Sequence, residues 1–387
     1  MDPVCVLQFT IGGPEFTGIA SFLYQYYKKI DQTRVHFDFV FCRQNSLKMV
    51  ADDPVFRDSD FIELGAVTRR NQISYPALAS GLEKIFRSRH YDVFHINTYR
   101  PGIAALCAAV ARKCRVKTVI VHSHNARFIM PGQQRRRILV NSAKKACGAY
   151  LRKHCSYMFA CSESAEEALF GRRGVGQDNF RVIKNAIDSS LYRFDPAARQ
   201  QIREREKTGE DELVLGIVGR LSLQKNQIFG IKVLEEILKK RKNVSLWLIG
   251  TGPDEAGLRE AAGQGNIADR VLFFGQRTDV ARLMQAMDAL LLPSTSEGLG
   301  IVAIEAQAAG LPVYASDGVP EETRITSLIH YYPLADGPDK WAGRILQDLP
   351  EQERTDTYEK ILKSGYDISS EAKALESFYV GLADGSR

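Results

Sequence analysis

The feature that most constrains the fold is the alternation of short apolar runs with amphipathic stretches along nearly the whole chain. Strands that alternate with helices of this length imply β-α-β units and parallel sheets. We therefore predict an α/β fold. The predicted strands are Val4–Phe9, Val35–Phe41, Val93–Asn97, Thr118–Val121, Tyr157–Cys161, Phe180–Ile183, Leu213–Val218, Val244–Ile249, Val271–Phe274, Ala289–Leu292 and Pro312–Ala315.

The chain length of 387 residues favours two domains, because one hydrophobic core rarely grows so large. The pattern changes near residue 190, where a turn-like stretch precedes a charged, helix-prone segment. We predict one doubly wound, Rossmann-like domain over residues 1–190 and a second over residues 191–368. Two such domains in series predict a ligand cleft between them, at the carboxyl ends of both sets of strands. A helix in residues 369–387 is expected to cross back to the first domain.

The composition is that of an ordinary globular protein, with 44% apolar and 25% charged residues. No apolar run approaches the roughly 18 residues of a membrane-spanning helix, and the first residues lack the features of a signal peptide. These observations predict a cytoplasmic location. The seven cysteines include no Cys-x-x-Cys pair, so we expect reduced thiols and no metal site.

The net charge of +6 is unevenly distributed, because the N-terminal half is basic and the C-terminal half is acidic. A basic half predicts an anionic partner, such as a phosphate or an acidic lipid surface. No nucleic-acid-binding motif accompanies the charge, so we expect no nucleic acid partner. The basic stretch 134–153 has two interpretations. It could form a peripheral contact with an anionic membrane surface, or it could be a solvated helix packed on the core.

Two glutamates, Glu297 and Glu305, flank a glycine-containing turn between an apolar strand and an Ala-rich helix. Glycine lets the backbone approach a ligand closely, and a helix N-terminus offers free N–H groups to a phosphate. Carboxylates accept hydrogen bonds from sugar hydroxyls but repel bare anions. The element therefore predicts a site for a polyol that is attached to phosphates.

A second motif, Gly219-Arg220-Leu-Ser-Leu-Gln-Lys225-Asn226, follows the strand Leu213–Val218 and opens a helix. Arg offers a rigid fork to phosphate oxygens, and Lys offers a mobile charge. Both cations would lie at the carboxyl end of a strand, where ligands bind in such folds. The alternative is a solvated loop with two surface cations.

Two further turns in the first half are candidate ligand contacts. The glycine-rich turn after the first strand contains Gly13 and could meet a phosphate or sugar, although a plain tight turn is the alternative. His124 lies at the end of a predicted strand, where it could donate to a sugar oxygen or stabilise charge in a transition state. A purely structural role for His124 remains open.

Taken together, these motifs resemble glycosyltransferase family 4, whose members are retaining enzymes of the GT-B fold. The resemblance covers roughly residues 4–380 and is most specific in the C-terminal half. Looser matches in the N-terminal half resemble the branch that makes bacterial exopolysaccharide and capsule. The motifs are Gly219-Arg-Leu-x-x-x-Lys225-Asn, Gly275-Gln-Arg-x-Asp279-Val, Pro293-Ser-x-x-Glu297-Gly, Glu305-Ala-Gln-Ala-x-Gly-Leu-Pro, Phe37-Asp-Phe, Tyr91-Asp-Val-Phe-His95, His122-Ser-His-Asn125, Ala160-Cys-Ser-Glu163 and Ile183-Lys-Asn185-Ala-Ile-Asp188.

The resemblance implies a role for each candidate residue. The first domain would face the acceptor and the second would bind the nucleotide-sugar donor, which is expected to be UDP-linked. Arg220 and Lys225 would hold the donor diphosphate and Glu305 the ribose, with Gly219 in the same turn. Glu297 and the backbone of Gly298, Leu299, Gly300 and Ile301 would hold the donor sugar and phosphates, while Gly13 would meet a phosphate and His124 the sugar.

The resemblance implies no metal and no other cofactor, so His124, Glu297, Arg220 and Lys225 are the predicted catalytic groups. The predicted reaction moves a hexose-type sugar from the donor to a saccharide or lipid-linked saccharide. Three alternatives stay open: a nucleotide-sugar 2-epimerase of the same fold, a non-catalytic protein that binds a polymer or membrane, and an NAD-dependent oxidoreductase. The missing dinucleotide fingerprint disfavours the last of these.

Overall fold

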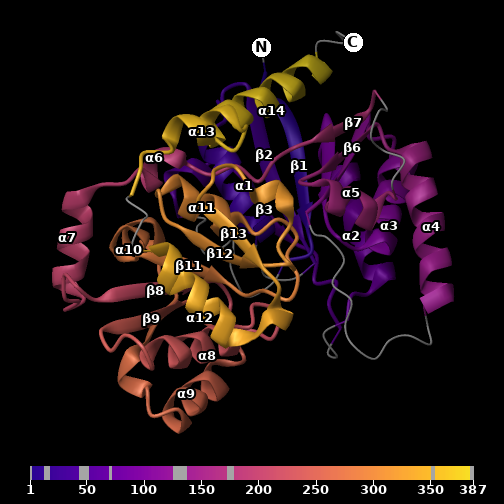
Figure 1. Ribbon diagram of the computed structural model, residues 1–387. Coiled ribbons are helices and arrows are strands. Elements are labelled where there is room, and N and C mark those ends of the chain that lie inside the picture. The colour runs from indigo at the N-terminus through magenta and orange to yellow at the C-terminus, as the bar shows by residue number, and fades with distance from the viewer. Residues whose placement is uncertain are drawn as a thin grey trace. The chain divides into compact units, whose positions relative to one another are not determined.

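The computed structural model describes residues 2–12, 18–42, 52–68, 72–124, 137–171, 178–349 and 354–383, with the backbone alone at 137–141, 163–164 and 383. The chain forms two compact units (Figure 1). Unit 1 comprises Met1–Ala186 together with Ile368–Arg387, and unit 2 comprises Ile187–Asp367.

Unit 1 is built on a seven-stranded sheet in the order β3-β2-β1-β4-β5-β6-β7, counted over its described residues. Every neighbouring pair in this sheet is parallel, as the alternating sequence pattern predicts. The strands are β1 (Val4–Thr10), β2 (Val35–Phe41), β3 (Phe61–Glu63), β4 (Val93–Asn97), β5 (Thr118–Ser123), β6 (Tyr157–Ala160) and β7 (Phe180–Val182).

Helices cover both faces of the unit 1 sheet, because successive side chains of a strand point to opposite faces. Leu7 and Phe9 of β1 belong to the core cluster shared with α2, α3 and α4. Val4 and Val6 belong to the cluster shared with α1 and α14. The helices of the unit are α1 (Gly18–Lys29), α2 (Tyr75–Ser88), α3 (Pro101–Lys113), α4 (Arg137–His154), α5 (Glu163–Leu169) and α14 (Ile368–Ala383).

The C-terminal helix α14 returns to unit 1, as the sequence predicts. Figure 1 shows α14, in yellow, beside β1 and β2, and its apolar face contributes Ala372 and Leu375 to the core. Glu376 forms an ion pair with Arg34 (2.5 Å) and accepts a hydrogen bond from the backbone N–H of Asp31 (2.9 Å). Buried apolar area supplies most of the stabilisation, since an ion pair that is half exposed contributes little.

Unit 2 contains a six-stranded parallel sheet in the order β10-β9-β8-β11-β12-β13. The helices α8, α9 and α12 pack on one face, and α7, α10 and α11 pack on the other. The strands are β8 (Leu213–Val218), β9 (Val244–Ile249), β10 (Val271–Gly275), β11 (Ala289–Leu292), β12 (Val313–Ser316) and β13 (Ile329–Tyr332). The helices are α6 (Ser189–Tyr192), α7 (Pro196–Arg205), α8 (Gln227–Leu238), α9 (Glu255–Gln264), α10 (Val280–Ala286), α11 (Ile301–Ala308), α12 (Gly337–Asp348) and α13 (Tyr358–Lys363).

Both units are therefore doubly wound α/β folds, and the predicted fold class is confirmed. Among the described residues, no helix combines the length and the apolar character that crossing a bilayer requires.

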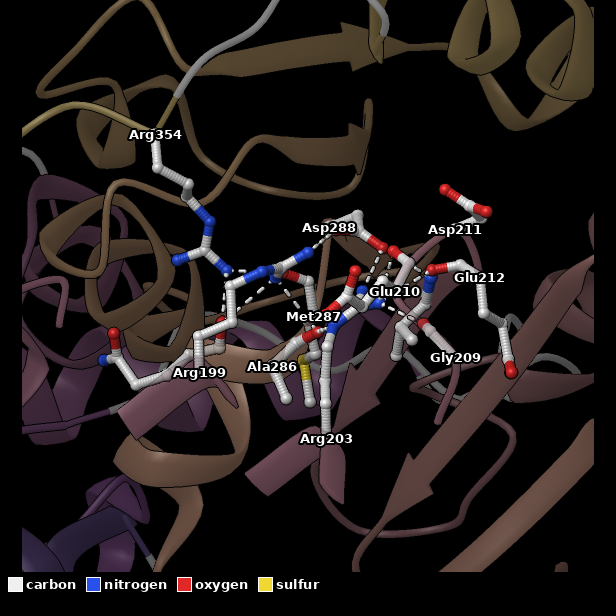
Figure 2. A network of polar contacts seen from close by, with 12 residues as sticks. Arg199, Arg203, Gly209, Glu210, Asp211, Glu212, Ala286, Met287, Asp288 and Arg354 are labelled. Carbon is white, nitrogen blue, oxygen red and sulfur yellow. Dashed lines mark hydrogen bonds and ion pairs between the residues drawn. The ribbon is translucent and has the colours of Figure 1, made fainter. Parts of the chain in front are cut away.

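Three arginines hold the beginning of β11 in place (Figure 2). Asp288, which directly precedes β11, forms ion pairs with Arg199 (2.5 Å) and Arg203 (2.8 Å) of α7. Arg199 and Arg354 also donate to the backbone oxygen of Met287, just beyond the carboxyl end of α10. Cations at a helix C-terminus interact favourably with its dipole and satisfy its free carbonyls. The strand that leads to the two-glutamate motif is thus anchored at its start.

Several polar side chains of unit 1 are buried on or directly after its central strands β4 and β5. His95 of β4, His122 of β5 and His124 are each at most 4% exposed. The rings of His122 and His124 lie 3.9 Å apart, and Phe22 packs edge-on against both. Burial lowers the pKa values of His95 and His122 well below 6.5 and that of His124 to about 3. The three imidazoles are therefore neutral at pH 7.

The buried histidines predict a stability loss in mild acid. Above about pH 6.5 they are neutral in both the folded and the unfolded chain and contribute nothing to the pH dependence. Below it, the unfolded chain binds protons that folded unit 1 cannot, so the free energy of unfolding falls by up to about 1.4 kcal/mol per histidine per pH unit. Urea unfolding at about pH 7.5 and about pH 5.5 should therefore differ by about 4 kcal/mol.

Asp38, whose pKa is lowered to about 2 by its hydrogen bonds, affects stability only in stronger acid, outside this window. The exposed His90 provides a matched control, and His90→Gln should retain the full pH dependence. Equal stability of the wild-type protein at the two pH values would contradict the neutral, buried state of these histidines.

Candidate functional site

The two motifs singled out in the C-terminal half meet where the strand order of unit 2 reverses. β8 lies between β9 and β11, and the helices that follow β8 and β11 pack on opposite faces of the sheet. The loops Gly219–Asn226 and Pro293–Gly300 therefore diverge from neighbouring strands at one edge. Ligands of open α/β sheets bind at such a reversal, because the diverging loops leave the strand ends accessible.

Glycines allow the loop after β8 to pack tightly against the loop after β9. Gly219 has φ +141°, which residues with a side chain rarely adopt. A Cβ atom on Gly250 would lie 2.1 Å from the carbonyl oxygen of Gly219, and a Cβ on Gly252 would lie 2.1 Å from that of Leu221. The backbone of the cation-bearing loop therefore rests directly on its neighbour.

Hydrogen bonds also join the loop after β8 to the loop after β11. The backbone N–H of Thr295 donates to the carbonyl of Gln224 (2.8 Å), and the Gln224 side chain donates to the carbonyl of Ser296 (2.8 Å). Asn226, at φ 54° before α8, donates from its side chain to the carbonyl of Pro293 (3.1 Å). These contacts fix the distance between the cations of one loop and the glutamate of the other.

Lys225 and Glu297 form an ion pair at the centre of this arrangement, with 2.7 Å between Nζ and Oε1. The hydroxyl of Ser294 donates to the same oxygen at 2.5 Å. The side chains of Lys225 and Glu297 are 20% and 8% exposed, so the pair is shielded from water on most sides. Lys225 and Ser294 thus contact the same carboxylate oxygen, Oε1.

The last residue of β12 and the loop that follows this strand also help to position Glu297. The backbone N–H of Glu297 donates to the carbonyl of Gly318 (2.9 Å), and the Ser316 hydroxyl donates to the carbonyl of Ser294. A Cβ on Gly318 would lie 2.6 Å from that same carbonyl, so only glycine fits there. Three loops of unit 2 therefore determine the position of one carboxylate.

The second glutamate of the motif belongs to α11. Gly300 caps this helix at φ +79°, Leu299 before it is buried, and Ile301 begins the first turn. Burial raises the pKa of Glu305, while a hydrogen bond from the Tyr192 hydroxyl and the charge of Lys225 oppose that rise. The structure thus brings Lys225 near both glutamates.

Some of the other predicted site residues are described by the structure, and others lie outside the described residues. Arg220 is exposed, and its carbonyl accepts a hydrogen bond from the Gln227 side chain (2.9 Å). His124 belongs to unit 1, where its Nε2 is bonded to Asn97 (2.9 Å). Gly13 and residues 134–136 of the basic stretch lie outside the described residues. Gly298 follows Glu297 in the loop described above.

The sequence analysis missed several residues that the structure places in these networks. Ser294, Ser316 and Gly318 hold Glu297, Tyr192 reaches Glu305, and Asn97 binds His124. The position of Ser294 three residues before Glu297 is a signal that could have indicated the contact. The others come from distant parts of the chain and have no such local signal.

Two family models match the chain. Residues 16–191 match the model described as Glycosyltransferase Family 4, and residues 198–327 match the one described as Glycosyl transferases group 1. Together they include all the motifs of the two loops described above.

Individual relatives agree with these matches. The putative glycosyltransferase EpsF of Bacillus subtilis is 26% identical over 380 residues, which is 95% of this chain and 94% of the relative. The D-inositol 3-phosphate glycosyltransferase of Mycobacterium marinum is 35% identical over 150 residues, 37% of this chain and 31% of the relative.

Solved structures show the same fold. The Anabaena protein Alr3699/HepE in complex with UDP has a TM-score of 0.70 at 18% identity, covering 98% of this chain and 96% of that one. A glycosyltransferase from Rickettsia africae has a TM-score of 0.76 at 15% identity, with complete coverage of both chains.

The close contact between the loops after β8 and β9 predicts that Gly252→Ala destabilises unit 2. The added methyl group would overlap the Leu221 carbonyl, so the backbone must move, at a cost of about 1–3 kcal/mol. Chemical denaturation followed by circular dichroism measures this loss.

Gly257 offers a matched control, because it lies in α9 with open space around the position of a Cβ. Gly257→Ala should stabilise the helix by about 0.5–1 kcal/mol. A Gly252→Ala protein as stable as the wild type would show that the two loops do not pack as described.

Proposed function

Because the chain belongs to glycosyltransferase family 4, we propose that it is a retaining enzyme that transfers a hexose from a UDP-linked donor to a saccharide or lipid-linked saccharide. The observation that carries this proposal is the Lys225–Glu297 ion pair, held by three loops where the strand order of unit 2 reverses. The pair places a cation for a diphosphate beside a carboxylate for sugar hydroxyls. The exopolysaccharide or capsule pathway is proposed from the N-terminal motifs.

The donor nucleotide is assigned from two kinds of support. The Anabaena protein HepE, which shares the fold of this chain, has been solved in complex with UDP and with UDP-glucose. In unit 2, Glu305 is the proposed ribose contact, because its carboxylate lies in the first turns of α11 near Lys225. Arg220 and Lys225 are the proposed diphosphate contacts, and Gly219 allows the backbone to approach the ligand.

The proposed role of Glu297 is to hold the transferred sugar. Ser294 and Lys225 both contact Oε1, and this arrangement leaves Oε2 as the oxygen directed to the sugar hydroxyls. The backbone of Gly298, Leu299, Gly300 and Ile301 leads into α11, whose N-terminus favours the donor phosphates. The family resemblance also gives Gly13 as a proposed contact of a phosphate and His124 as a proposed contact of the saccharide.

In the proposed mechanism, the protein stabilises the negative charge that develops on the diphosphate leaving group. The bond between the anomeric carbon and the phosphate oxygen breaks, leaving an oxocarbenium-like sugar and a diphosphate. Arg220, Lys225 and the N-terminus of α11 stabilise the leaving group, each contributing on the order of 2–4 kcal/mol to the transition state. The acceptor oxygen attacks the same face and its proton passes to the departing phosphate oxygen, so the anomeric configuration is retained.

The proposed membrane contact and lipid-linked acceptor rest on the positive charge of α4 alone. The described part of α4 carries the exposed cations Lys145 and Lys153. A basic helix favours an anionic lipid surface, as a lipid-linked acceptor would require. We propose a peripheral contact at the cytoplasmic face of the membrane through residues 134–153.

A thermal-shift panel of nucleotide sugars, followed by transfer assays with the stabilising donor, tests the function. UDP-hexoses should raise the melting temperature most, because ligand binding to the folded state shifts unfolding by mass action. Release of UDP coupled to a glycosylated acceptor supports the proposal. An isomerised sugar formed from the donor alone would instead identify a 2-epimerase, and no stabilisation by any nucleotide sugar would contradict a donor site.

Substitution of the donor contacts should remove activity without unfolding the protein. Lys225→Ala and Glu305→Ala are each expected to lower turnover on the order of 100-fold, because each removes a preorganised contact to the donor. The exposed Lys232 of α8 and Glu260 of α9 provide matched controls, and their Ala variants should retain turnover. Wild-type turnover in Lys225→Ala or Glu305→Ala would overturn the site assignment.

We also propose that transfer requires no metal ion, because the side chains and the helix N-terminus supply the positive charge at the leaving group. Turnover in EDTA should therefore stay within about twofold of the untreated enzyme. A loss that added Mg²⁺ or Mn²⁺ restores would contradict this part of the mechanism.

A further inference from the structure

Glu305 lies on the accessible side of α11. Within this helix, Ile301 and Glu305 retain partial exposure, while the six other residues are buried. Residues four apart share one face of a helix, and their side chains lean toward its N-terminus. The Glu305 carboxylate is therefore directed toward the N-terminal end of α11, where the donor phosphates are proposed to bind.

Tyr192 is a hydrogen-bond donor to this carboxylate. It is the last residue of α6, which packs against α10 and α11 (Figure 1). Its hydroxyl is hydrogen-bonded to the Glu305 side chain, and a carboxylate can only accept. Burial, and then the negative charge of Glu305, raise the pKa of Tyr192 well above 10. The hydroxyl therefore keeps its proton at neutral pH and can donate.

The side chain of Gln285 fixes the backbone at Tyr192. Gln285 belongs to α10 and is only 3% exposed. Its Nε2 donates to the carbonyl of Tyr192 (3.1 Å), and its Oε1 accepts from the backbone N–H of Asp195 (3.1 Å). Both ends of one buried amide group therefore hold the end of α6 against α10.

The ring of Tyr192 is held by apolar packing. It contacts one core cluster that contains Val302 and Ala306 of α11, and a second cluster that contains Leu299 and Ile304. Because the backbone and the ring are both held, the hydroxyl has little freedom to move away from Glu305. A side chain that is already ordered loses little conformational entropy when a ligand binds.

Opposing effects act on the charge of Glu305. Burial raises its pKa, whereas the hydrogen bond from Tyr192 and then the positive charge of Lys225 lower it. Asp188, just before α6, adds negative charge near Tyr192. The hydrogen bond from Tyr192 therefore favours the ionised form of Glu305, in which both carboxylate oxygens are acceptors.

We propose that Tyr192 is a positioning residue that holds the Glu305 carboxylate in place for the 2′ and 3′ hydroxyls of the donor ribose. A carboxylate has about four acceptor positions, so one bond from Tyr192 leaves room for two ribose hydroxyls. The ribose as the ligand rests on the proposed function, whereas the contact between Tyr192 and Glu305 does not.

Binding of UDP to the full-length protein tests this role, because it requires no acceptor. Tyr192→Phe keeps the packed ring and removes only the hydroxyl, so the protein should stay folded. UDP binding should weaken about fivefold to tenfold, the effect of one lost hydrogen bond to a charged group. The analogue 2′,3′-dideoxy-UDP lacks both ribose hydroxyls, so its affinity should be the same in Tyr192→Phe and the wild type. Isothermal titration calorimetry measures both affinities.

Tyr332 offers a matched control, because its hydroxyl also donates to a carboxylate, that of Asp348 (2.8 Å), at the edge strand β13. Tyr332→Phe removes an equivalent bond away from Glu305 and should leave the UDP affinity unchanged. In a Glu305→Ala protein, the additional change Tyr192→Phe should have no further effect on UDP affinity, because Tyr192 acts through Glu305.

The pH dependence of binding separates positioning from simple packing. UDP affinity should fall in acid as Glu305 takes up a proton and loses an accepting oxygen. Tyr192→Phe removes a bond that lowers the pKa of Glu305, so this fall should begin at a higher pH than in the wild type. The phosphates of UDP also gain protons in acid, and the same titration with 2′,3′-dideoxy-UDP corrects for that.

Equal UDP affinity in Tyr192→Phe and the wild type would overturn the proposal. An equal loss of affinity for UDP and for 2′,3′-dideoxy-UDP would do the same, because it would leave Tyr192 a purely structural role. Failure of the wild type to bind UDP at all is a separate outcome. It would contradict the proposed donor site itself, and the role of Tyr192 at the ribose with it.

Discussion

The ion pair between Lys225 and Glu297 is the interaction on which the proposed donor site depends. Each partner sits on a different loop, and neither loop alone could hold its charge in a mostly buried position, since an unpaired buried charge is costly. The Ser294 hydroxyl donates to the carboxylate and compensates for part of its lost hydration, and the Gly318 carbonyl accepts from the backbone N–H of Glu297. A donor diphosphate that binds Lys225 would therefore meet a cation already positioned, with little reorganisation needed during the reaction.

Unit 1 offers a different kind of chemistry. Around its buried histidines, unit 1 contains neutral side chains joined by a chain of hydrogen bonds, and burial holds these histidines uncharged. The C-terminal helix α14 contributes Tyr379 to these hydrogen bonds. It therefore adds polar contacts to unit 1 as well as apolar packing.

The alternation of apolar and amphipathic segments was sufficient to predict the parallel sheets, since buried parallel strands are short continuous apolar runs. It missed β3 and β13, because both are edge strands of only three and four residues with polar members such as Glu63 and His330. Lys225 and Glu297 were recognisable from their motifs. The contact of the Ser294 hydroxyl with the same oxygen was missed, because the three-residue spacing gives a contact only in the loop conformation that Ser316 and Gly318 support. The contact of His95 with Tyr379 joins residues 284 positions apart, beyond the reach of any local pattern.

Hydrogen–deuterium exchange of the wild-type protein with and without UDP-glucose tests the central claim most directly, because it reports where the donor binds without requiring an acceptor. The account predicts slower exchange of the backbone amides in residues 219–226 and 297–301, where the two loops meet at the reversal of strand order. Unchanged exchange in both loops at saturating UDP-glucose, or protection confined to other parts of unit 2 such as α9 and α12, would contradict it.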